Sequence, residues 1–144
     1  MKRALFAYLL MLSVSLMQAQ EDDILARGEQ GDANAQNEIG VMYANGDGVI
    51  KDAAEAVKWY RKAAEQGLAG AQLILGWMYV HGDGVIKDLV EAHAWFNVAG
   101  ANGLEFAKDY LKIIEKEMTR EQIAGATKLA KERFERINAS NAKR

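Results

Sequence analysis

Apolar and polar positions recur along the chain with a period of 36 residues. Residues 31–66 align with residues 67–102 without a gap, and 18 of the 36 aligned positions are identical. A repeat of this length is typical of stacked supersecondary units, because one unit cannot bury its own apolar face and needs a neighbour to cover it. The pattern therefore predicts two structural repeats that stack side by side.

Within each repeat the apolar spacing predicts two helices, which we call helix A and helix B. Helix A is expected near residues 33–45 and 69–81, and helix B near residues 53–66 and 89–102. In the first helix A, Ala35, Ile39 and Tyr43 fall on one face at i, i+4 spacing. The expected core face of helix B combines small and aromatic residues: Ala56, Trp59, Tyr60 and Ala63 in the first repeat, and Ala92, Trp95, Phe96 and Ala99 in the second.

One glycine lies inside each A helix, at Gly40 and Gly76. Glycine in a helix costs roughly 1 kcal/mol relative to alanine. We expect a close approach of helix B to compensate for this cost, because a side chain at the glycine would block that approach.

The connection from helix A to helix B has the same seven residues in both repeats, at 46–52 and 82–88. Its two glycines permit backbone angles that other residues resist. Asp52 and Asp88 are suited to cap helix B, and a glutamate three residues later predicts a capping box.

The regions outside the repeats are expected to cap the stack. Residues 20–31 echo the end of a helix B and predict a partial N-terminal capping helix. Residues 103–138 predict a degenerate third helix pair and C-terminal cap, because Lys112 stands where helix A carries its glycine. Thr119 is suited to cap the last helix. Residues 139–144 are expected to form a disordered tail.

The first 19 residues have the pattern of a secretory signal peptide. Lys2 and Arg3 precede an uncharged, mostly apolar run over residues 4–17, and an acidic segment begins at residue 21. The run is shorter than the roughly 20 residues that span a bilayer comfortably. We predict cleavage after Ala19. The alternatives are an uncleaved membrane anchor or a buried N-terminal helix.

The net charge and the content of cysteine and histidine exclude some classes of function. Without the signal peptide, 16 Lys and Arg stand against 20 Asp and Glu, a net charge of −4. An acidic surface argues against nucleic acid as a partner, since such binding needs clustered positive charge. The chain has no cysteine and two histidines, which makes a metal site improbable. We expect no cofactor, export to the periplasm or the medium, and no stable membrane insertion after cleavage.

Residues suited to catalysis are few, and we assign none. His81 and His93 are the two histidines, and Ser140 is the one serine beyond the signal peptide. This composition argues against a hydrolytic triad. Asp47 and Asp83 with their glycines bear a faint likeness to a calcium loop, which also needs a bidentate acid at its twelfth position. A repeat turn explains them better.

The residues shared by the two copies resemble the Sel1-like repeat family. The pattern corresponds to Gly40, Tyr43, Gly46, Gly48, Asp52 and Trp59 in the first copy, and to Gly76, Tyr79, Gly82, Gly84, Asp88 and Trp95 in the second. The family is related to tetratricopeptide repeats. The resemblance therefore implies an all-α fold, a short right-handed α-solenoid of antiparallel helix pairs with terminal capping helices. It also implies an adaptor or scaffold role without enzymatic activity.

In solenoids of this kind, certain helix A positions line a concave groove. In this chain they include Asn34, Asn37, Val41 and Asn45 in the first repeat, and Leu73, Trp77, Val80 and His81 in the second. The residues at these positions differ between the repeats, as expected if each meets a different part of a partner. We predict that a peptide or helix docks there, with Trp77 as anchor. The alternative is that Trp77 and Leu73 pack in the core.

Three functions follow as hypotheses. The leading one is an exported adaptor or scaffold that binds an unidentified protein or peptide. The second is an immunity or inhibitor protein that neutralises a secreted effector. The third is an envelope enzyme acting on cell-wall or β-lactam substrates. The subgroup linked to penicillin binding is rich in cysteine, which this chain lacks.

Overall fold

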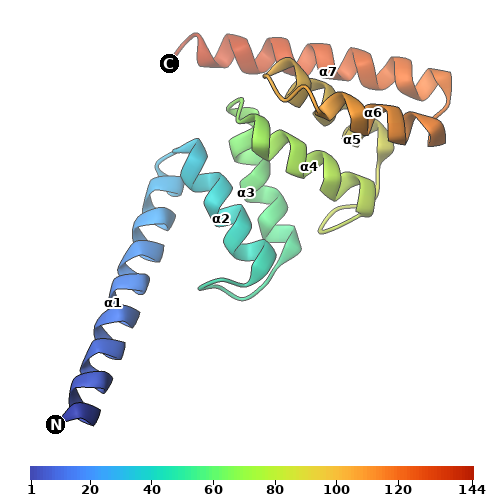
Figure 1. The fold of residues 1–144 in the computed structure, drawn as a ribbon. Helices are drawn as coiled ribbons and strands as arrows, with labels where there is room; N and C mark the ends of the chain where they lie inside the picture. The colour runs from blue at the N-terminus through green and yellow to red at the C-terminus, as the bar shows by residue number, and fades with distance from the viewer.

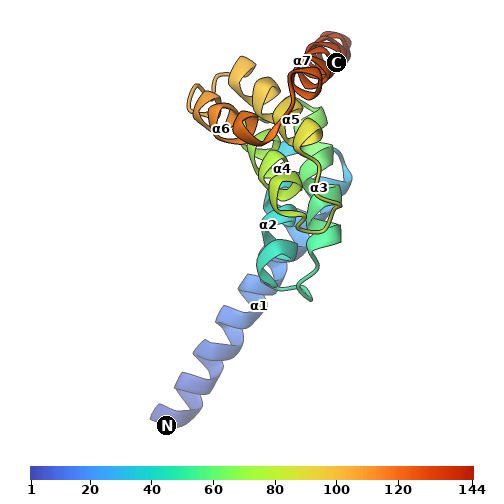
Figure 2. The same cartoon turned by 90° about the vertical axis from the view of Figure 1, so that its right-hand side faces the viewer.

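The computed structural model describes residues 1–144 and contains helices but no strand. The elements are α1 (Lys2–Glu29), α2 (Ala33–Asn45), α3 (Ala53–Glu65), α4 (Ala69–His81), α5 (Leu89–Ala101), α6 (Ala107–Ile114), the 3-10 helix η1 (Glu115–Glu117) and α7 (Arg120–Asn141). The fold is the expected short right-handed α-solenoid. The antiparallel pairs α2–α3 and α4–α5 stack in its centre, α1 projects from one end and α7 covers the other (Figure 1). The first part of α1 stands clear of the solenoid (Figure 2).

Each hairpin is held by an aromatic ring that lies on a glycine backbone. A Cβ atom built on Gly40 would lie 2.7 Å from ring carbons of Tyr60, and one built on Gly76 would lie 2.6 Å from a ring carbon of Phe96. Both rings are buried. Protein interiors are close-packed, so an added methyl group has no room at such short distances. The expected close approach at the two glycines is therefore confirmed.

The A-to-B turns close through the aspartates, as expected. Each A helix ends at a left-handed glycine, Gly46 or Gly82, with φ of 83° and 74°. The Asp52 carboxylate then accepts hydrogen bonds from the backbone N–H groups of Ala54 and Glu55, at 2.9 and 3.1 Å. Asp88 caps α5 in the same way.

The reciprocal half of the predicted capping box is not formed at α3 or α5. Glu55 pairs with Lys58 on the same helix, and Glu91 pairs with Arg133 of α7. A carboxylate that has a cation within reach gains a charge-assisted bond there, in place of a bond to a neutral N–H. Thr119 and Gln122 do form a complete capping box at the start of α7.

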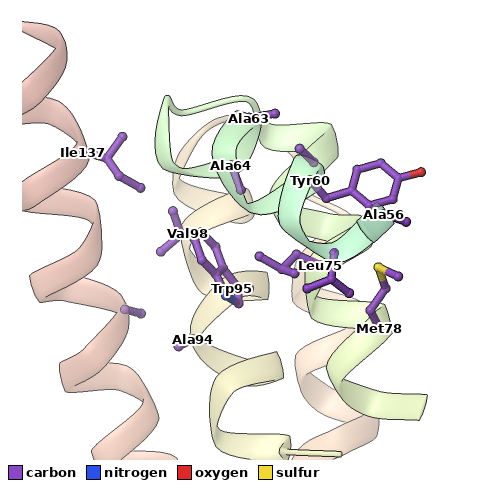
Figure 3. Close-up of a cluster of buried hydrophobic side chains, with 13 residues drawn as sticks. Ala56, Tyr60, Ala63, Ala64, Leu75, Met78, Ala94, Trp95, Val98 and Ile137 are labelled. Atoms are coloured by element: carbon purple, nitrogen blue, oxygen red, sulfur yellow. The ribbon is translucent and has the colours of Figure 1, made fainter. Parts of the chain in front are cut away.

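The solenoid core lies between the two repeats. Leu75 and Met78 of α4 meet Tyr60 of α3 and Trp95 of α5, and Ile137 of α7 closes one side (Figure 3). Trp95 is fully buried. Its equivalent Trp59 is only half-buried, contrary to expectation. The Lys62 ammonium lies 3.9 Å from the Trp59 ring centre, whereas the guanidinium of Arg133 from α7 covers Trp95 at 4.1 Å.

Buried amide side chains link each unit to the previous one, a feature that the sequence analysis missed. Gln36 donates to the Gly28 carbonyl at 3.0 Å, and Gln72 donates to the Ala64 carbonyl at 2.9 Å. Each glutamine oxygen accepts in turn from the next junction, from Gln66 at 2.7 Å and from Asn102 at 2.9 Å. The identity of Gln36 and Gln72 at equivalent positions was the available signal.

The C-terminal region departs from a third helix pair. Helix α7 packs against α5, not against α6. Arg133 anchors it through a 3.0 Å ion pair with Glu91. The helix also continues to Asn141, whose side chain donates to the Gln66 carbonyl at 2.9 Å. The expected disordered tail over residues 139–144 is therefore wrong for its first three residues. At the other end, α1 runs unbroken from the expected signal peptide into the expected cap.

Substitution of Gly76 by alanine tests the ring-on-glycine contact. We expect Gly76→Ala to lower the free energy of unfolding by about 1–3 kcal/mol through overpacking against Phe96, although alanine favours a helix by roughly 1 kcal/mol. Gly125→Ala in α7 is the matched control, since nothing lies within 4 Å of a Cβ there. Urea denaturation followed by circular dichroism compares the two. Equal stability of both variants would contradict the contact.

Candidate partner-binding surface

The predicted groove residues lie on α2 and α4, and their exposure differs between the two helices. On α2, Asn34 and Asn45 are exposed, Val41 is 38% exposed and Asn37 is half-buried. The α4 members are more covered: His81 is exposed, while Leu73, Trp77 and Val80 are half-buried. The first repeat therefore offers a mainly polar strip and the second a mainly apolar one.

Trp77 is the centre of the apolar part. The His81 ring stacks on it, with 5.2 Å between centroids and 7° between planes. The edges of Tyr110 and Phe96 meet it at 4.8 and 5.8 Å. Leu73 and Val80 pack against the same cluster. Trp77 thus packs against α5 and α6 and keeps part of its surface accessible, and its role as an anchor stays a prediction.

Helix α6 and the residue that precedes it add two aromatic residues that the sequence analysis did not assign to this surface. Tyr110 meets Trp77, and Phe106, which is 48% exposed, meets Tyr110 at 6.2 Å in an edge-to-face arrangement. His81, Trp77, Tyr110 and Phe106 together form what we call the aromatic row, in which each ring contacts the next. The i, i+4 spacing of Phe106 and Tyr110 was the signal that could have found them.

Hydrogen-bonding groups on α2 complete the surface. The side-chain oxygen of Asn37 is buried and has no hydrogen-bond partner in the chain. Such a group costs free energy unless a donor reaches it. Asn45 donates to the Asp47 carboxylate at 3.3 Å, and Asn34 is free to bond outward. A partner could form hydrogen bonds with the exposed Asn34 and Asn45 and place an apolar or aromatic side chain against the accessible part of Trp77.

The second histidine, His93, has a structural role. His93 is buried, and its Nε2 lies 2.8 Å from a Glu115 carboxylate oxygen while its Nδ1 lies 2.9 Å from the Asn97 amide. This network ties η1 to α5. No group of three His, Asp or Glu side chains is placed to hold a metal ion.

Three pKa values depart from their usual range, and all belong to residues outside this surface. A hydrogen bond from the Ala35 backbone lowers the pKa of Asp32, the hydrogen bond to Glu55 raises that of Lys58, and burial raises that of Tyr60.

A hollow of about 560 Å³ lies away from this surface, where the C-terminal ends of α3 and α7 meet. Lys62, Arg136 and Arg144 line it together with Glu65 and two glutamines. Cations at helix C-termini offset the partial negative charge of the free carbonyls. Their position therefore has a structural explanation, and we assign no ligand to this hollow.

Two segments, residues 33–68 and 69–104, match the Sel1 repeat. The chain belongs to the Sel1 repeat family. The matched segments have the 36-residue period of the sequence analysis and begin two residues later. Sel1 repeat proteins generally mediate protein–protein interaction. No curated protein matches the chain.

Two solved structures of Sel1 repeat proteins are similar to this chain. One is a protective antigen present in uropathogenic Escherichia coli strains, which displays an SLR fold. It has a TM-score of 0.79 and 36% identity, and the match covers 85% of this chain and 27% of that one. The other is a Sel1 repeat protein from Oxalobacter formigenes. It has a TM-score of 0.61 and 38% identity, and the match covers 63% of this chain and 26% of that one. The chain thus spans about a quarter of the length of each.

Proposed function

We propose that this Sel1 repeat protein is an exported, non-enzymatic adaptor that binds a protein or peptide on the face formed by α2, α4 and α6. The observation that carries the proposal is the aromatic row, in which His81 and Phe106 are exposed and Trp77 and Tyr110 are partly accessible. An accessible aromatic cluster next to hydrogen-bonding groups is the composition of interface hot spots. The general role of the family supports the same function.

The proposed binding mode places an apolar or aromatic side chain of the partner against Trp77. The exposed amide side chains of Asn34 and Asn45 on α2 would form hydrogen bonds with the partner. Because His81 and Phe106 lie at the two ends of the aromatic row, a partner segment that follows the row crosses from α4 to α6. An extended segment or a short helix has this shape.

Truncation of Trp77 tests the anchor. The partner is first captured by crosslinking in the native envelope, and its affinity for the full chain is then measured by titration. We expect Trp77→Ala to weaken binding by about 2 kcal/mol, roughly 30-fold, as for a hot-spot aromatic residue. Trp59→Ala is the matched control, because Trp59 is also half-buried but packs beside Gly28 on α1.

Two further variants distinguish a loss of binding from a loss of the fold. His81 and Phe106 are exposed, so His81→Ala and Phe106→Ala should leave the circular dichroism spectrum unchanged and still weaken binding. Full affinity in all three aromatic-row variants, each with an intact fold, would sink the proposed site.

The packing of α1 supports removal of the first 19 residues. Residues 1–20 are all exposed, and burial against the solenoid begins at Glu21. Ile24 and Gly28 then pack toward α2 and α3, so that a cut after Ala19 keeps the part of α1 that caps the first repeat. A signal peptide has to be separable from the fold in this way.

Export is tested on the protein isolated from its native host. We expect the mass of the mature chain to correspond to residues 20–144 and Edman sequencing to begin at Gln20. An Ala19→Arg variant should accumulate as an uncleaved precursor, because signal peptidase requires a small residue there. A mature protein that keeps residues 1–19 would favour the membrane-anchor alternative.

A further inference from the structure

Two isoleucines are almost fully exposed at equivalent positions of the two repeats. Ile50 is 91% exposed and Ile86 is 90% exposed. Each lies in an A-to-B turn, directly before an exposed lysine, Lys51 or Lys87. A single exposed apolar residue needs no explanation. These two, however, belong to a seven-residue segment that is identical in both repeats, although half of the repeat positions differ.

Both turns lie on the edge of the solenoid from which α1 projects. Helices α1 and α2 are antiparallel neighbours, so the N-terminal half of α1 extends past the end of α2 where the first turn begins. The second turn lies on the same side, farther from α1 (Figure 1). We call residues 46–52 and 82–88 together the turn edge.

The first turn lies beside the residues of α1 at which the apolar run ends. Glu21 of α1 contacts Gly48 of the turn, and Met17 and Gln20 border a small hollow together with Met42 and Asp47. None of the apolar window of α1 is buried against the fold. The whole helix, which is longer than the uncharged run, meets the length and composition of a membrane span, as a signal sequence also does. Lipid that surrounds this run therefore ends at the height of the first turn.

We propose that, before the first 19 residues are removed and while α1 is inserted in a bilayer, the turn edge rests on the lipid surface with Ile50 and Ile86 in the interfacial region. The lysine stems next to the isoleucines can lie along the apolar zone while their ammonium groups reach phosphates. Spanning helices are tilted by about 20° on average. A tilt of α1 toward the second repeat lowers the second turn to the surface.

The charged residues near the turn edge indicate which lipid headgroups it can approach. Glu21, Asp22 and Asp23 follow the apolar run, and each turn carries two aspartates (Asp47 and Asp52, or Asp83 and Asp88) against one lysine. The turn edge together with this acidic segment is negative. Like charges repel across a membrane surface within about 10 Å at ordinary ionic strength. The contact therefore fits a surface of neutral headgroups and weakens as anionic lipid is added.

The chain has no cysteine, so single cysteines report on depth in the full-length protein. Ile50→Cys, Ile86→Cys, Leu10→Cys and Lys128→Cys chains are each labelled with the fluorophore NBD and reconstituted in phosphatidylcholine vesicles. Leu10 lies in the apolar run, and Lys128 is exposed on α7 at the far end of the molecule. We expect blue-shifted emission, quenched by nitroxide-labelled lipid, at positions 10, 50 and 86, and water-like emission at position 128.

A water-like label at both 50 and 86, with position 10 in lipid, would overturn the proposal. A water-like label at position 10 would overturn it as well, because the lipid contact needs an inserted α1. Two further arms exclude insertion driven by the fluorophore. Ile50→Ser should reduce the blue shift of a label at position 86, and added phosphatidylglycerol should reduce it too. If the blue shift at position 86 is unchanged by Ile50→Ser, or unchanged by phosphatidylglycerol, that result would also contradict the contact. Partner affinity at Trp77 is measured separately, so either proposal can fail alone.

Discussion

The structure depends on the contact between an aromatic ring of helix B and a glycine of helix A. Tyr60 on Gly40 and Phe96 on Gly76 set the distance between the helices of each hairpin. At that distance the connection has to turn sharply, and the left-handed glycines at 46 and 82 allow it to do so. The backbone N–H of Asp52 then bonds to the Tyr43 carbonyl at 2.9 Å, which brings the capping carboxylate to the start of α3. Because the second hairpin repeats the same contact, the two units have matching shapes and can stack.

Stacking itself relies on buried polar groups that are fully paired. Gln36 and Gln72 each bridge to a carbonyl of the preceding unit, and burial of an amide is tolerated only with such partners. In the third unit the equivalent residue is Lys108, which is exposed. A lysine cannot take the buried position, so the amide series ends there. Helix α7 then packs on α5, where Arg133 pairs with Glu91 and covers Trp95.

The structural features that could be predicted from the sequence are those whose pattern is present in both repeats. The helix bounds, the capping aspartates and the role of Gly40 and Gly76 follow from local patterns present in both copies. The position of α7 rests on long-range contacts, such as the pair of Arg133 with Glu91, 42 residues apart, and the bond from Asn141 to the Gln66 carbonyl, 75 residues apart. No second copy of that pair exists to reveal it. Half-burial of Trp59 has the same origin, since no equivalent of α7 covers the first repeat. In the candidate site, α2 and α4 positions came from the repeat register, whereas Phe106 and Tyr110 lie in the divergent third copy, whose residues were not assigned to the groove.

The two sides of the solenoid therefore differ in what they can bind. On the α5 side, α7 closes the apolar surface with an ion pair and a cation–π contact, and little is left for a partner. On the side of α2, α4 and α6, the short α6 has no following helix over it, so Phe106 and part of Trp77 stay accessible. Positions that hold the hairpins together are identical or similar in the two repeats, as with Gly40 and Gly76 or Tyr60 and Phe96, and positions on this open face are not. The four contacting rings on this face pack partly against the α5 core and keep part of their surface accessible, and an accessible aromatic cluster of this kind supports the proposed partner site.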